Sequence, residues 1–242
     1  MTTSTFPALG AALLAGVLVA AAAQAGTETG AITGRVRLDG TAPQRPVITM
    51  SADPACDRLF PNGRPSEMVI VDPAGGLANV LVYVKAGLPD DFQPPPPPAA
   101  AASIDQKGCA YVPHVLGVRV DQEVEIHNGD ATLHDVNARS TVNPPFNAPM
   151  PVQNQVLRKA FRHPELPVKL KCDIHPWMSA YIGVFAHPFF AVTGADGSFS
   201  IPGLPVGDYT IEAWHESLAV RYAKVSVEAD VSARLEFSFA GN

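Results

Sequence analysis

The sequence predicts an all-β protein of the β-sandwich type. Apolar and polar residues alternate with a period of two in many stretches, whereas the 3.6-residue period of an amphipathic helix is scarce. Turn dipeptides separate the alternating stretches, and they include Asp39-Gly40, Asn128-Gly129, Asp196-Gly197 and Pro202-Gly203. The 242 residues are enough for one large domain or two small ones.

The strands can be placed by this alternation along the chain. The candidates include, in order, Ile32–Leu38, Val80–Lys85, Val118–Ile126, Val168–Cys172, Tyr181–Phe185, Ser198–Ile201, Tyr209–Ala213, Arg221–Val227 and Arg234–Phe239. Strands this short, divided by turns at regular intervals, are typical of sandwiches.

The N-terminus predicts a secretory signal peptide over residues 1–25. This stretch contains no charged side chain, carries an apolar run from Ala8 to Ala23, and ends in the small-x-small pattern Ala23-Gln24-Ala25. An N-terminal anchor is the alternative, because Lys and Arg are missing ahead of the apolar run. We expect a periplasmic or secreted protein with no membrane span after cleavage of the signal.

Charge and cysteine count narrow the functional classes. The net charge of −6 argues against a nucleic-acid partner and weakly favours a basic protein partner. An export compartment tolerates disulfides, and three cysteines can form one pair with one left over. If Cys172 binds a metal, Cys56 and Cys109 are the natural pair. Otherwise Cys172 is paired and another thiol is free.

A proline run interrupts the β pattern between Pro94 and Ser103, in the sequence PPPPPAAAAS. Five consecutive prolines favour polyproline II geometry and cannot enter the interior of a sheet. The run predicts a stiff spacer between structural units, with a loop inside one domain as the alternative.

The most informative segment is PVKLKCDIHPWM, which ends at Met178. Val168, Leu170 and Cys172 share one face of the predicted strand, so the thiol should point inward. His175 and Met178 follow at intervals of three residues. A further histidine is needed to surround a metal, and His134 suits this role because it alternates with Val136 and Ala138 on a buried face. Soft sulfur suits Cu(I) and imidazole suits Cu(II), so this set suits copper in both states.

The motif Cys172-x-x-His175-x-x-Met178, with LHDV around His134 upstream, resembles the type 1 blue copper site of the cupredoxins, and its HPWM sequence is closest to the amicyanins. The resemblance implies one copper ion per chain, with His134, Cys172 and His175 as strong ligands and Met178 as the axial ligand. It also implies electron exchange through an exposed edge of His175, with Pro176 and Trp177 in the surrounding docking patch. Zinc is the competing metal, although methionine is a poor zinc ligand.

One residue departs from the cupredoxin pattern. The family usually carries Asn after the first histidine ligand, where its side chain bridges the two ligand loops, and here the residue is Asp135. The expected hydrogen bonds around the ligands are therefore in question. A carboxylate at this position would favour Cu(II).

A second resemblance covers the segments on either side of the copper motif. ITGRVRLDGTAP and ANVLVYVKAG before it, and AVTGADGSFSIPGLPVGDYTIEAWHE after it, resemble a carboxypeptidase regulatory-like β-sandwich of the transthyretin type. The two resemblances together imply a Greek-key β-sandwich cupredoxin domain at residues 99–188, inserted between halves of the second sandwich at 26–98 and 189–242. Two consecutive or merged sandwiches are the alternative.

These observations predict an electron carrier and not an enzyme. The sequence lacks the His-x-His pairs of multicopper oxidases and the common hydrolase motifs, and the expected ligands leave no open copper position. The expected partner is a redox protein such as a c-type cytochrome or a periplasmic dehydrogenase. The alternatives are a copper storage or chaperone protein and a carbohydrate-binding surface module.

Overall fold

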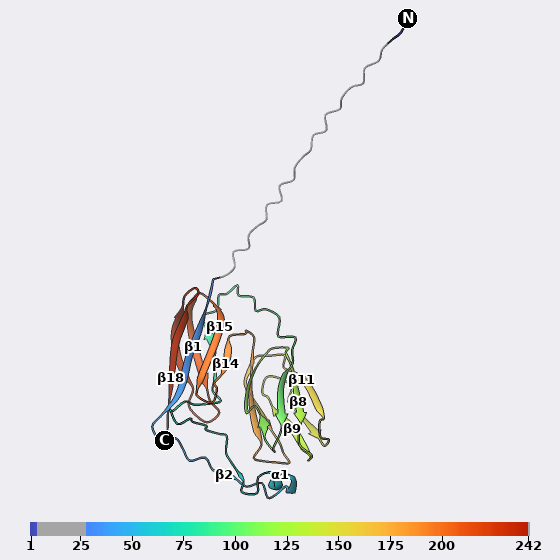
Figure 1. Cartoon of the computed structure of the whole chain (residues 1–242), viewed down its shortest axis with the longest axis vertical. Helices are drawn as coiled ribbons and strands as arrows, with labels where there is room; N and C mark the ends of the chain where they lie inside the picture. Colours follow the sequence, from blue (N-terminus) through green and yellow to red (C-terminus); the bar gives the residue numbers. More distant parts are fainter. Residues whose placement is uncertain (4–27, 242) are drawn as a thin grey trace.

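The computed structural model describes residues 1–3 and 28–241, and nearly all of its regular structure is β-strand (Figure 1). The all-β prediction is confirmed. Most of the predicted signal peptide lies outside the described residues. Within them, α1 (Pro54–Leu59) is the one α-helix, and no helix has the length and apolar character needed to cross a membrane.

The strands that come first and last in the chain share one pair of sheets, which we call the outer unit. One sheet has the order β15-β1-β18 and the other β14-β4-β16-β17. β1 pairs in parallel with β18 from Ala31 to Asp39, so the first and last strands of the described chain lie in one sheet. The bounds are β1 Thr29–Asp39, β4 Leu81–Ala86, β14 Phe190–Val192, β15 Ser198–Pro205, β16 Gly207–Trp214, β17 Arg221–Val227 and β18 Ser232–Ala240.

The strands between β4 and β14 form the other pair of sheets, which we call the central unit. Their orders are β10-β9-β12-β13-β7 and β11-β8-β5-β6. The inward side chains of both sheets meet in one apolar cluster that includes Ile104, Val136, Leu170 and Cys172. The bounds are β5 Ala102–Gln106, β6 Tyr111–Val112, β7 Val115–Arg119, β8 Glu123–Asn128, β9 His134–Arg139, β10 Phe146–Met150, β11 Val156–Ala160, β12 Glu165–Lys171 and β13 Ser179–Phe185.

The two units lie side by side, and glycines allow their close approach (Figure 1). A Cβ atom on Gly117 of β7 would lie 2.6 Å from the ring of Phe190. A Cβ on Gly183 of β13 would lie 2.8 Å from Leu81. Any larger residue at these positions would therefore force the Phe190 or Leu81 side chain to move.

The proline run is held against the central unit. The guanidinium of Arg119 donates hydrogen bonds to the carbonyls of Pro95 (3.0 Å) and Ala186 (3.1 Å), and burial lowers its pKa. The chain segments that lead into and out of the central unit are thus tied together by one side chain. The five prolines, Pro94–Pro98, contain no strand, as their composition predicts, and β5 begins after them at Ala102.

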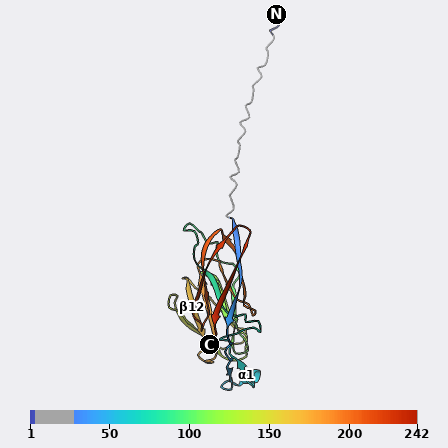
Figure 2. The same ribbon diagram turned by 90° about the vertical axis from the view of Figure 1, so that its left-hand side faces the viewer.

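A segment from the first part of the chain extends beneath the central unit. It contains β2 (Val47–Ile48), α1 and β3 (Arg64–Pro65), and we call residues 47–65 the cap. In both views α1 lies at one end of the molecule, beyond the strand ends (Figure 1, Figure 2). The cap side chains Met50 and Cys56 are buried in the apolar cluster of the central unit. Sequence alternation gave no indication of this packing.

One predicted strand was wrong in its extent. Val118–Ile126 was expected to be continuous, but β7 ends at Arg119 and β8 begins at Glu123. Asp121 has a φ of 65°, which turns the chain between them. This turn contains no glycine to mark it in the sequence, and the alternation of apolar and polar residues does not reveal where β7 ends.

Glu165 ties β12, which Cys172 follows, to the turn after β9, which begins at His134. Its carboxylate, at the start of β12, accepts hydrogen bonds from the β9–β10 turn, including the Thr141 amide (2.6 Å) and the Asn143 side chain (3.0 Å). Burial raises its pKa, but these bonds and that from Ser140 outweigh burial and lower the pKa from 4.5 to about 2.

A depressed pKa makes the contribution of Glu165 to stability dependent on pH. The contribution is complete above pH 4.5, where the unfolded carboxyl is ionised, and it is lost as pH falls towards about 2. We expect Glu165→Gln to lower the free energy of unfolding by about 2–3 kcal/mol at pH 7. Urea unfolding at several pH values checks this. The difference in free energy of unfolding between wild type and Glu165→Gln must shrink as pH falls from 4.5 towards about 2. A difference that stays constant over this range would contradict the stabilising role of the Glu165 carboxylate.

Candidate metal centre

Three predicted ligands converge at one end of the central sandwich. His134 begins β9, Cys172 follows β12, and His175 lies in the loop after it, and all three side chains are buried. The Cys172 Sγ lies 3.6 Å from His175 Nδ1 and 4.0 Å from His134 Nδ1, and the two Nδ1 atoms are 2.9 Å apart. Ligands held about 2.0–2.3 Å from one metal ion have similar mutual separations. The three atoms could therefore bind a single ion.

The outer nitrogen of each imidazole faces a carboxylate. His134 Nε2 lies 3.1 Å from Asp130 Oδ2, and His175 Nε2 lies 3.0 Å from Asp53 Oδ2. An ionised carboxylate only accepts hydrogen bonds, so each Nε2 is placed to donate a proton to its carboxylate. The two Nδ1 atoms face each other and the Cys172 sulfur. A ring that donates from Nε2 can offer its Nδ1 lone pair to a metal ion, so the arrangement fits a bound metal ion.

Charge in the site also favours a cation. Burial raises the pKa values of Asp53 and Asp130, but hydrogen bonds from their histidine partners and from backbone amides outweigh it, lowering the pKa of Asp53 to about 2 and that of Asp130 below its ordinary value. Both are therefore anions at neutral pH. Among the described residues, their ion-pair partners are the two imidazoles, not Lys or Arg.

The Cys172 thiol is buried, and backbone amides point towards its sulfur. Burial raises the pKa of its thiol to about 11, although the backbone amides of Asp135 and His175 lower it in part. The His175 amide lies 3.4 Å from the sulfur. Such amides stabilise a thiolate, and a cation would supply the remaining stabilisation.

The ligand loop closes on itself between Cys172 and Met178. The Met178 amide donates to the His175 carbonyl (2.9 Å), and the Cys172 amide donates to the Met178 carbonyl (3.3 Å). Met178 is buried in the same apolar cluster as Cys172. The loop thus brings the predicted axial residue next to the strand end that carries the thiol.

Asp135 bridges the two ligand loops. Its Oδ1 accepts a hydrogen bond of 2.6 Å from the Asp173 amide, while its carbonyl accepts from Tyr111 and Gln106. The bridge that Asn makes in the cupredoxins is therefore available to the carboxylate. Having Asp135 where the cupredoxins have Asn therefore keeps the hydrogen bond that links the His134 strand to the Cys172 loop.

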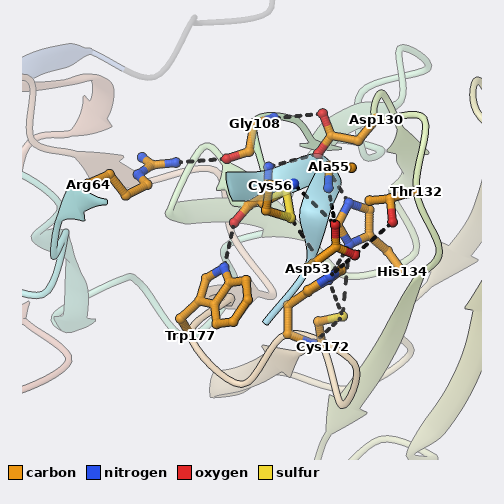
Figure 3. The surroundings of a disulfide bond; sticks show 12 residues. Asp53, Ala55, Cys56, Arg64, Gly108, Asp130, Thr132, His134, Cys172 and Trp177 are labelled. Atoms are coloured by element: carbon orange, nitrogen blue, oxygen red, sulfur yellow. Dashed lines mark hydrogen bonds and ion pairs between the residues drawn. A yellow bond between two sulfur atoms is a disulfide. The ribbon is translucent and has the colours of Figure 1, made fainter. Parts of the chain in front are cut away.

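The predicted disulfide is present and holds the cap beside the site (Figure 3). Cys56 on α1 is bonded to Cys109, and the Cys56 sulfur lies 3.8 Å from His175 Nε2. The same view labels Asp53 and Thr132, and the Thr132 hydroxyl donates to Asp53 Oδ2 (3.0 Å). The free cysteine of the described chain is Cys172.

The cap covers His175, so the expected exposed edge of this side chain is absent. An exposed edge of His175 was expected, yet this side chain is 1% exposed, because Asp53 and the disulfide cover its Nε2 side. Pro176 is exposed and Trp177 is partly buried, with its indole N–H donating to the Cys109 carbonyl (3.2 Å). The Trp177 ring lies 5.1 Å from the His175 ring.

A groove of about 330 Å³ lies between the cap and the ligand loop. Its lining includes Met50 and Met68 from the first part of the chain, Trp177 and Met178 from the loop, and His114 with Glu216 at the contact between the units. Trp177 and Met178 thus connect the buried site with this opening.

Sequence reasoning missed Asp53 and Asp130 as neighbours of the ligands. Asp53 precedes Pro54, a pairing typical of a helix start, and its Oδ1 accepts from the amides of Ala55 and Cys56. That signal could have predicted α1 but not its position over His175. Asp130 lies four residues before His134, and no strand periodicity links the two.

No known protein family matches the sequence, and no curated protein does. Among solved structures, similarity is found to a copper-containing nitrite reductase from Thermus scotoductus SA-01 (24% identity, 41% of this chain and 25% of that chain, TM-score 0.33). It is also found to a purple cupredoxin from Nitrosopumilus maritimus (21%, 35% and 99%, TM-score 0.31) and to an oxidised P96G mutant of amicyanin (18%, 43% and 98%, TM-score 0.33). The chain spans about a quarter of the nitrite reductase. These distant likenesses carry no conclusion about the activity of this protein.

Proposed function

We propose that the protein is a type 1 copper protein that shuttles single electrons between redox partners in the periplasm or outside the cell. The observation that carries the proposal is the convergence of His134 Nδ1, His175 Nδ1 and Cys172 Sγ in a buried site whose outer nitrogens face carboxylates. Copper bound there would supply a Cu(II)/Cu(I) couple.

The donor set favours copper over zinc. Two imidazoles and one thiolate with a weak axial thioether suit both copper oxidation states, whereas a structural zinc site takes four strong ligands. The two histidines and Cys172 would hold the ion, and Met178 would supply the weak thioether ligand. The apolar cluster would exclude water, and the cap would limit movement of the ligands. A site that rearranges little between oxidation states exchanges electrons readily.

The test is a visible absorption spectrum of the chain from Gly26 titrated with Cu(II). We expect an intense blue thiolate-to-copper band that saturates at one equivalent and is absent in Cys172→Ser, because the band requires the thiolate. His127→Ala, outside the site, is the control and should keep the band. A colourless wild-type protein, or a band that survives in Cys172→Ser, would reject the proposal.

The route of the electron would differ from the simple cupredoxin expectation. Because His175 is covered, we place the route along Trp177, which lies against the His175 ring and faces the groove. Pro176 would border the same docking patch. The expected partner remains a c-type cytochrome or a periplasmic dehydrogenase, and no bound substrate is transformed.

We also propose the domain arrangement that underlies this function. A cupredoxin domain at residues 99–188 would be inserted into a carboxypeptidase regulatory-like sandwich formed by 26–98 and 189–242. Support comes from the sheet orders, in which β5 to β13 pair among themselves, while β1 pairs with β15 and β18 and β4 pairs with β14 and β16. The signal peptide at 1–25 would direct export.

The alternative function, carbohydrate binding, would need an exposed aromatic side chain on which a sugar ring can stack. Trp214, the side chain suited to stack on a sugar, packs against Tyr181 with ring centroids 5.5 Å apart, in the cluster between the units. Copper storage remains the other alternative, and rapid release of Cu(I) to a competing chelator would distinguish it from electron transfer.

A further inference from the structure

We propose that Asp53 is the positioning residue of the copper site, and that through it the cap controls whether His175 can bind the metal. The proposal rests on the copper function proposed above and deepens it. Asp53 lies 122 residues before His175 in the sequence, on the N-cap of α1. It belongs to a segment that the ligand motif does not include.

The two carboxylate oxygens of Asp53 have separate partners. Oδ1 accepts from the amides of Ala55 (2.6 Å) and Cys56 (3.1 Å), which begin α1. Oδ2 lies 3.0 Å from both His175 Nε2 and the Thr132 hydroxyl. The capping contacts fix the carboxylate, and the disulfide at Cys56 fixes the helix, so Oδ2 is held in place against the imidazole.

This contact determines which nitrogen of His175 is free. A carboxylate at Nε2 requires a proton there, so the neutral ring presents its Nδ1 lone pair towards Cys172 and His134. Asp130 makes the corresponding contact with His134, and its oxygens are fixed by the amides of Gly108 and Cys109. Each cysteine of the disulfide therefore donates its backbone amide to a different aspartate. Cys56 donates to Asp53, which contacts His175, and Cys109 donates to Asp130, which contacts His134.

Asp53→Asn separates positioning from folding. Asparagine is as good an N-cap as aspartate, so its oxygen should keep the amides of Ala55 and Cys56. Its NH₂ group then replaces Oδ2 and donates towards His175 Nε2. The ring must respond by placing its proton on Nδ1, the atom that should bind copper.

The first measurement is made without metal. Nitrogen-15 NMR of the metal-free chain at alkaline pH should show His175 protonated at Nε2 in wild type and at Nδ1 in Asp53→Asn. Asp57→Asn is the matched control, because it removes one negative charge from the same helix and is not among the contacts of His175. It should leave the wild-type tautomer unchanged.

The second measurement uses copper. Asp53→Asn should bind Cu(II) about 10–100-fold more weakly than wild type and Asp57→Asn, as for other residues that orient metal ligands. If Cu(I) binding is unchanged, each tenfold loss raises the reduction potential by about 59 mV. Hydrogen exchange of α1 should remain slow in both variants, which excludes loss of the cap as the cause.

The outcomes separate this proposal from the proposed function. A wild-type His175 protonated at Nδ1, or an Asp53→Asn protein with wild-type tautomer, Cu(II) affinity and potential, would overturn the role of Asp53 even if the blue band forms. A wild type without a blue band would reject the type 1 copper function, while the tautomer measurement would still decide whether Asp53 positions His175.

Discussion

Replacing both cysteines of the disulfide, as Cys56→Ala/Cys109→Ala, should lower the free energy of unfolding by about 4 kcal/mol. The bond joins residues 53 positions apart, and cross-linking a loop of this length removes much conformational freedom from the unfolded chain. Alanine is preferred because both side chains are buried, where a serine hydroxyl would need a partner. Urea unfolding of the metal-free protein measures the change.

The same variant should expose the metal site. Without the bond, the cap is held by Asp53, by the buried Met50 and by Arg64, which donates to the Gly108 carbonyl (3.3 Å). We expect the amides of α1 to exchange with solvent faster and copper to reach an external chelator faster, because segments with few anchors open locally. Thiol reductants are unsuitable for this test, since the freed thiols would bind copper themselves.

Leu59→Ala is the matched control on the same helix. Leu59 is 55% exposed, so its truncation should change neither stability nor chelator access appreciably. A loss below about 1 kcal/mol in the double variant, with slow exchange in α1, would mean that the remaining contacts hold the cap. The disulfide would then be dispensable for closing the site.

The strands and the ligand loop could be predicted because their signals are local. Alternation marked β1, β4, β12 and the last three strands, and the inward parity of Val168 and Leu170 extended to the buried Cys172. The same parity put His134 on a buried face. Residues within one strand or loop reveal their relation through spacing alone.

The cap could not be predicted because its contacts are long-range. Residues 47–65 have no regular alternation, and prolines at 54, 61 and 65 interrupt any pattern. Its apolar side chains complete a cluster formed by strands much later in the chain. The covering of His175 follows from that docking, which is why the expected exposed edge was wrong.

The second large effect is expected in the outer unit, from Gly34→Ala in β1. A Cβ atom on Gly34 would lie 1.7 Å from the Leu235 carbonyl oxygen of β18. A backbone atom cannot move aside without separating the two paired strands, so we expect a loss of about 3 kcal/mol or more. Gly194→Ala is the control, because its nearest neighbour would be 3.4 Å away, an ordinary contact.

Hydrogen exchange and the copper band together would show whether the two units are independent domains. Gly34→Ala should reduce amide protection in β1, β15 and β18, which share one sheet, while β8, β9 and β12 keep theirs. The blue band should remain, because the disulfide still holds Asp53 beside His175 when the outer unit loosens. Equal loss of protection in both units would contradict an inserted domain. The close packing of Gly117 and Gly183 against the outer unit would then make the sandwiches one cooperative structure.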